Sequence, residues 1–120
     1  MATKNAFAGD LIDFIDASPT AFHAVETSAK RLKRAGFEEL DEGDAWKLKK
    51  GGKYYIKKNN SALLAFVVGR GNPAETGFRI VGTHTDTPCF RVKPMPEMTS
   101  EETYVKLNTE VYGGPILSTW

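Results

Sequence analysis

The stretch that most constrains the fold runs from Phe78 to Pro88, with the sequence FRIVGTHTDTP. Its first half is apolar and rich in β-branched residues, which predicts a buried strand. That strand would deliver His84 and Asp86 to its carboxyl end, where open α/β sheets usually carry their chemistry. Side chains two residues apart in an extended segment project from one face, so the Asp86 carboxylate is expected beside the His84 imidazole. This spacing suits a metal ligand, because a ligating imidazole normally gives its other ring N–H to a carboxylate or carbonyl.

The same pair has a plainer interpretation, in which His84 ends a strand and Asp86 forms a turn before Pro88. Zinc takes three or four protein ligands, and the only other histidine of the chain, His23, lies far upstream. The run therefore predicts at most part of a metal site, and further ligands must come from elsewhere.

Composition narrows the class of protein. The length of 120 residues suits one domain, the 41% of hydrophobic residues is adequate for a core, and the formal net charge is +1. No strong charge points to nucleic acid or to a membrane surface. The start, MATKNA, leads into an amphipathic pattern, and no apolar run approaches membrane-spanning length. We expect a soluble, cytoplasmic protein, and the single cysteine, Cys89, agrees with a reducing compartment.

The first third of the chain predicts two helices. Phe7, Leu11, Phe14 and Ile15 recur at helical spacing before the sequence ASP interrupts the pattern. A second helix is expected to follow, with Ser18 as its N-cap and Pro19 at its first position. Its apolar stripe consists of Phe22, Val25, Ala29 and Leu32. Gly36 is suited to the position just after its end.

Short strands are expected from Phe37 onward. The runs 53–58 and 62–68 flank the turn sequence Asn59-Asn60-Ser61, which predicts an antiparallel hairpin. A loop over 70–77 leads to the strand that carries His84. A further strand is expected at 90–93, closed by Pro94-Met95-Pro96. A polar stretch over 97–103 then precedes a last strand at 104–107. The chain stops on an apolar tail, Ile116 to Trp120, which predicts a truncated polypeptide.

Several of these runs together resemble one family, the aspartyl aminopeptidase family of metallopeptidases, which includes the vacuolar aminopeptidase I type. The matching pieces occur in the family's order and cover nearly the whole chain. They are FIDASPTAFH at 14–23, AGF at 35–37, the region 46–55, GTHTDTPCFRVK at 82–93, YGG at 112–114 and STW at 118–120.

The resemblance implies a two-zinc aminopeptidase that removes N-terminal residues, with acidic Asp or Glu preferred in much of the family. His84 matches the family's first zinc-ligand histidine, and Asp86 matches the carboxylate that orients it. Residues 1–120 would form the N-terminal segment of an α/β, zinc-exopeptidase-like catalytic domain, two helices followed by a mixed sheet. The rest of that domain and any inserted dimerisation domain would be absent, so the 120-residue chain alone is expected to be inactive.

The resemblance also implies peptide substrates with a free N-terminus and a homo-oligomer of the dodecamer type. Histidine and carboxylate ligands accept zinc, cobalt or manganese, so the identity of the metal stays open. A hypothesis of another class is that the chain is a non-catalytic folding or assembly module that associates with itself through strand edges and its apolar tail.

Four other features have competing interpretations. His23 is assigned a structural place on its helix, and Cys89 is expected to be buried and reduced. The lysine-rich tract over 47–58 is interpreted as a solvated face offset by the acidic segment 38–44. The YGG sequence at 112–114 is either an ordinary tight turn or an approach of backbone to the metal centre.

Overall fold

The computed structural model describes residues 4–114 and Ser118. It forms two compact units, Met1–Thr85 and Asp86–Trp120. The first unit contains helices α1 (Lys4–Asp16), α2 (Ala21–Arg34) and α3 (Pro73–Thr76), with strands β1 (Glu38–Glu39), β2 (Lys53–Lys58) and β3 (Ala62–Val67). The second contains β4 (Cys89–Ser100) and β5 (Tyr104–Tyr112). The expected order of two helices followed by a mixed set of strands is thus confirmed.

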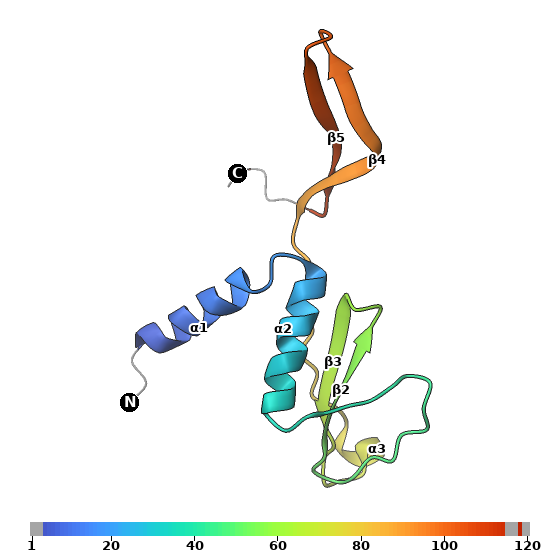
Figure 1. Ribbon diagram of the computed structural model, residues 1–120. Coiled ribbons are helices and arrows are strands. Elements are labelled where there is room, and N and C mark those ends of the chain that lie inside the picture. Colours follow the sequence, from blue (N-terminus) through green and yellow to red (C-terminus); the bar gives the residue numbers. More distant parts are fainter. Residues whose placement is uncertain (1–3, 115–117, 119–120) are drawn as a thin grey trace. The chain divides into compact units, whose positions relative to one another are not determined.

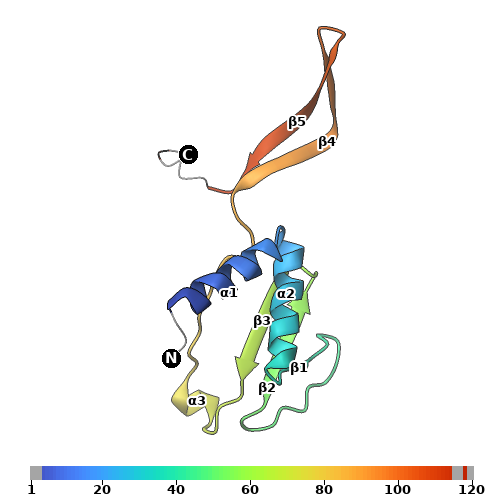
Figure 2. The same ribbon diagram turned by 60° about the vertical axis from the view of Figure 1, so that its left-hand side comes forward.

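In the first unit, three strands pair in the order β1-β2-β3, with β1 parallel and β3 antiparallel to the central strand β2. Helix α2 lies against β2 and β3 (Figures 1 and 2). The buried core consists of Val25 and Ala29 of α2 and of Tyr54, Tyr55 and Ile56 of β2. Three consecutive residues of β2 are buried because the strand is covered on both faces.

Different segments of the chain pack against the two faces of β2. Tyr55 lies toward α2, beside Val25 and Ala29. Tyr54 lies toward the long segment between β1 and β2, and its hydroxyl accepts a hydrogen bond from the backbone N–H of Lys49 at 3.1 Å. The Tyr54 ring also packs against Phe66 of β3, with a centroid distance of 5.7 Å. The irregular segment 40–52 thus covers the face of the sheet opposite α2.

The second helix begins two residues later than the sequence pattern predicts. Thr20 is the N-cap, and its hydroxyl accepts a hydrogen bond from the backbone N–H of His23. The prediction of Ser18 as N-cap is wrong, since the helix starts at Ala21 and the Ser18 hydroxyl has no hydrogen-bond partner. Pro19 fits the turn before the cap, because the residue before a proline avoids the helical region.

The end of α2 follows the prediction. Gly36 adopts a φ of +82° just after the helix. The N–H of Gly36 donates to the carbonyl of Lys33, and the N–H of Phe37 donates to that of Leu32. These two bonds define a Schellman motif, which satisfies carbonyls that the helix end leaves unpaired.

The predicted hairpin forms, and the two strands predicted after it pair with each other in a second hairpin that extends beyond their predicted bounds. Strand β2 pairs with β3 from Lys53↔Val67 to Lys58↔Ala62, around the expected Asn59-Asn60-Ser61 turn. Strand β4 does not end at Pro94-Met95-Pro96, but passes through a bulge between Val92 and Glu97 and continues to Ser100. A bulge absorbs residues that cannot pair, which is where prolines in strands are tolerated. The predicted polar separator is therefore mostly strand.

Parts of the two apolar stripes that the sequence predicts on the helices of the first unit are exposed to solvent. On α1, Phe7, Leu11 and Ile15 are 78, 58 and 57% exposed. On α2, Phe22 is 60% exposed, whereas Val25 and Ala29 are buried as predicted. The apolar tail that the sequence analysis singled out lies outside the described residues, apart from Ser118. Among the described helices, none has the length and apolar character needed to cross a membrane.

Candidate metal centre

The segment that carries His84 is irregular in this structure. Residues 77–84 form neither helix nor strand, and the backbone bends at Thr85 and Asp86. The prediction of a buried strand here is wrong for the chain as described, since Phe78, Ile80 and Val81 are 78, 83 and 92% exposed. No strand of the described residues pairs with this segment, and an apolar run becomes a buried strand only when a neighbouring strand satisfies its backbone groups.

His84 and Asp86 flank the boundary between the two units. His84 is exposed and lies at the end of the first unit, and Asp86, also exposed, opens the second. The bend between them means that the strict alternation of an extended strand does not apply at this point. Both side chains belong to the classes that zinc accepts, an imidazole nitrogen and a carboxylate oxygen. Their roles as metal ligand and orienting carboxylate stay predictions.

The donors present fit only part of a zinc site. Within the part of the chain that the structure describes, no group of three or more His, Cys, Asp or Glu residues is placed to hold a metal ion. One imidazole and one carboxylate leave a tetrahedral site short of protein ligands. A complete centre would need donors beyond those described.

His23 and Cys89 are the other two residues to which the sequence gives competing interpretations. His23 lies on the first turn of α2, exposed, with its Nδ1 2.8 Å from the Thr20 hydroxyl. This position agrees with its assignment to the helix rather than to a metal. Cys89 is a free cysteine, as expected, but it is exposed at the start of β4. The prediction of burial is wrong, because a two-stranded ribbon has no second layer to cover its faces.

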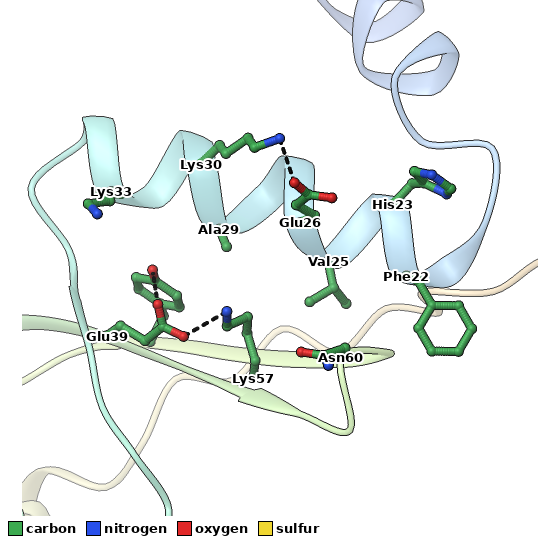
Figure 3. Close-up of a pocket in the computed structure, with 11 residues that line it drawn as sticks. Phe22, His23, Val25, Glu26, Ala29, Lys30, Lys33, Glu39, Lys57 and Asn60 are labelled. Atoms are coloured by element: carbon green, nitrogen blue, oxygen red, sulfur yellow. Dashed lines mark hydrogen bonds and ion pairs between the residues drawn. The ribbon is translucent and has the colours of Figure 1, made fainter.

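A groove lies between α2 and the sheet of the first unit. It has a volume of about 470 Å³, and Val25, Ala29 and Tyr55 line its floor. Figure 3 shows an ion pair on each wall: Lys30 contacts Glu26 at 2.7 Å on the helix, and Lys57 contacts Glu39 at 2.8 Å on the sheet.

A buried tyrosine, Tyr55, also binds the carboxylate of the ion pair on the sheet. The Tyr55 hydroxyl donates to the second carboxylate oxygen of Glu39 at 2.8 Å. The hydrogen bonds from Lys57 and Tyr55 hold the pKa of Glu39 below its usual value. Burial, followed by the bond to Glu39, raises the pKa of Tyr55. Sequence reasoning missed this trio, although Tyr55 and Lys57 are two residues apart and so share a strand face.

The lysine-rich tract is largely a solvated face, as predicted. Lys58 pairs with Glu42 at 2.6 Å, and Lys57 pairs with Glu39. Both carboxylates belong to the acidic segment that was expected to offset the tract. These lysines are therefore partly neutralised within the chain and do not form an open basic patch.

Comparison with known proteins decides the family. A family model described as aminopeptidase I zinc metalloprotease (M18) matches residues 14–120. The chain belongs to the M18 peptidase family. It is 62% identical to the probable M18 family aminopeptidase 2 of Clostridium novyi over 120 residues, which cover 100% of this chain and 28% of that relative. The corresponding protein of Clostridium acetobutylicum is 57% identical, with the same coverage.

Solved M18 structures match the fold. The mApe1 of Chaetomium thermophilum aligns with a TM-score of 0.82 and 36% identity over 96% of this chain and 26% of that one. The mApe1 of S. cerevisiae, described as a dodecamer, aligns at 0.78 and 33% over 92% of this chain and 26% of that one. The M18 chain thus spans about a quarter of the length of these relatives. Its α/β architecture corresponds to the N-terminal part of M18 structures, as predicted.

Proposed function

We propose that the complete polypeptide to which this chain belongs is a zinc-dependent aminopeptidase. The observation that carries the proposal is the M18 match over residues 14–120, supported by a relative that is named a probable M18 family aminopeptidase 2 and is 62% identical over the full chain. The substrates would be peptides with a free N-terminus. We further propose a preference for N-terminal Asp or Glu, a homo-oligomeric assembly and a cytoplasmic location.

In this proposal His84 is one ligand of a centre with two zinc ions. Its imidazole would be neutral and would use one ring nitrogen for the metal. Asp86 would accept a hydrogen bond from the other ring nitrogen, which fixes the tautomer and the direction of the ring. A zinc pair, when bound, lowers the pKa of a water and polarises the scissile carbonyl. Cobalt or manganese would be accepted by the same donor types.

Substitution of His84 tests the proposal. In the complete polypeptide, His84→Ala should lower bound zinc and remove nearly all release of Asp from an Asp-anilide, because a metal ligand is lost. Asp86→Asn should keep the metal and reduce turnover by about 10–100-fold, the usual effect of losing a partner of a ligating imidazole. Zinc content and initial rates measure both effects.

His23→Ala is the matched control, because it removes the other histidine from a place on α2 that the helix cap explains. It should leave zinc content and turnover at the level of the unsubstituted enzyme. Full activity of the His84→Ala variant would refute the proposed ligand, and full activity of Asp86→Asn would refute the orienting role.

For the 120-residue chain alone we propose weak zinc binding and no hydrolysis, since the described residues hold no group of three metal donors. The exposed apolar residues of the segment 78–81 favour self-association of the isolated chain. Stoichiometric zinc with measurable release of Asp would contradict this view. A zinc-free oligomer is the expected state of the isolated chain, and the hypothesis of an assembly module predicts the same state.

A further inference from the structure

Gly113 follows the end of the β4–β5 hairpin, at its open base. The first pair of the ladder joins Cys89 to Tyr112, so the chain leaves the hairpin at Pro88 on one side and at Gly113 on the other. Gly113 has a φ of +91°, in the left-handed region that other residues rarely adopt. The adjacent Tyr112 ring is held by the Arg91 guanidinium, which lies 4.4 Å from its centroid. The position of Gly113 is therefore set by the hairpin itself.

Gly113 also lies against the backbone of Pro88. A Cβ placed on Gly113 would be 3.1 Å from Pro88 Cα and 3.4 Å from Pro88 Cβ and Cγ. Carbon atoms in favourable contact are about 3.5–4.0 Å apart, so Pro88 would have to move by a few tenths of an ångström. The neighbouring Gly114 differs, because an added Cβ there meets nothing within 4 Å.

A displacement of Pro88 would be transmitted along the backbone to Asp86. The proline ring fixes its own φ, and it restricts Thr87 to the extended region. The segment between Asp86 and Pro88 is therefore stiff, and a displacement at Pro88 is passed to Asp86 rather than absorbed. We infer that Gly113 is a positioning residue for Asp86. This inference rests on the proposed function, in which Asp86 orients the imidazole of His84.

Gly113→Ala in the complete polypeptide tests the inference, with Gly114→Ala as the matched control. We expect Gly113→Ala to weaken zinc binding about tenfold, as for other changes that disturb the partner of a ligating imidazole. A fall in kcat should accompany it, with KM for Asp-anilide unchanged. Gly114→Ala should stay within about twofold of the unsubstituted enzyme. Competition with a chromophoric chelator measures the affinity independently of turnover.

A third variant separates contact from backbone strain. Asn tolerates positive φ better than Ala does, but it carries the same Cβ. Gly113→Asn should therefore impair zinc binding as Gly113→Ala does. Unchanged zinc affinity in both variants would overturn the inference, as would loss of folding in both by circular dichroism, since Gly113 would then support the whole unit. His84→Ala distinguishes the underlying proposal: if that variant keeps zinc and activity, the proposed function itself fails.

Discussion

At the scale of single residues, the cap of α2 tests how the helix begins. The Thr20 hydroxyl accepts from the N–H of His23 and lies 2.8 Å from His23 Nδ1. Thr20→Ala removes this acceptor and should lower the free energy of unfolding by about 1 kcal/mol. Urea denaturation followed by circular dichroism measures the change. Ser18→Ala is the control, and it should be neutral or slightly stabilising, because the shielded Ser18 hydroxyl has no partner. The opposite ranking would restore Ser18 as the N-cap.

The second residue-scale prediction concerns pH. Hydrogen bonds from Lys57 and then Tyr55 lower the pKa of Glu39 in the folded state. A lowered folded pKa means that folding favours the carboxylate, so the stabilisation is complete above the unfolded pKa and is lost as pH falls through the folded one. Glu39→Gln should cost about 0.5 kcal/mol at neutral pH, a small value because the side chain is 47% exposed.

The cost of Glu39→Gln should shrink as the pH falls below the ordinary value of 4.5 and vanish once the carboxyl is protonated in both states. Denaturation curves across the acid range measure it. Glu26→Gln serves as a comparison, since the pKa of Glu26 is lowered mainly by a hydrogen bond from Lys30 on the helix surface, without a buried partner. A cost for Glu39→Gln that does not change with pH would contradict the assigned ion pair.

At the scale of elements, the two hairpin turns have the same backbone conformation but differ in sequence. Asn59 and Asn60 have φ values of 49° and 54°, and Glu101 and Glu102 have 53° and 54°. The N–H of Ser61 donates to the carbonyl of Lys58 and that of Thr103 to Ser100, so both turns have the type I′ pattern. Asn suits these angles and Glu does not. The second turn is thus the weaker one.

Glu101→Asn combined with Glu102→Gly should therefore stabilise the β4–β5 hairpin by roughly 1 kcal/mol. The effect should be visible because a two-stranded ribbon is only marginally stable by itself. Hydrogen exchange at the amide of Val105 should slow about fivefold, the factor that corresponds to 1 kcal/mol. The opposite pair of substitutions, Asn59→Glu with Asn60→Glu, should speed amide hydrogen exchange in β2 and β3. Unchanged rates in both hairpins would show that these turns do not limit strand pairing.

The sequence predicts correctly those elements whose hydrogen bonds join residues close together in the chain. The Asn59-Asn60-Ser61 turn and the Gly36 helix end need only their neighbours in sequence, and both are confirmed. The segment from Phe78 to His84 needs a partner strand, which sequence spacing cannot supply, and the buried strand expected there is not formed. The candidate site follows the same division, since the spacing of His84 and Asp86 predicts them as a pair, whereas the close approach of Gly113 to Pro88 is visible only in the folded structure.

At the scale of the whole molecule, the exposed apolar segment predicts how the isolated chain behaves. Phe78 and Val81 are 78 and 92% exposed, and contiguous apolar surface of this kind drives association. Sedimentation velocity should show oligomers that grow with concentration, and sulfate should strengthen them, as it does hydrophobic contacts. Phe78→Ser combined with Val81→Thr should shift the chain toward monomer. A monomer at every concentration, or association that salt of any kind weakens, would contradict an apolar origin.

The same segment should behave differently in the complete polypeptide. The relative at 62% identity is more than three times as long as this chain, which covers 28% of its length. We expect the additional polypeptide to pair with residues 78–82 and to exclude water from them, since their pattern is that of a buried strand. Hydrogen exchange at the Ile80 amide should then be slow in the complete polypeptide and fast in the 120-residue chain. Equal rates would mean that His84 lies on an irregular loop in both, and the metal centre would have to be assembled without a strand beneath it.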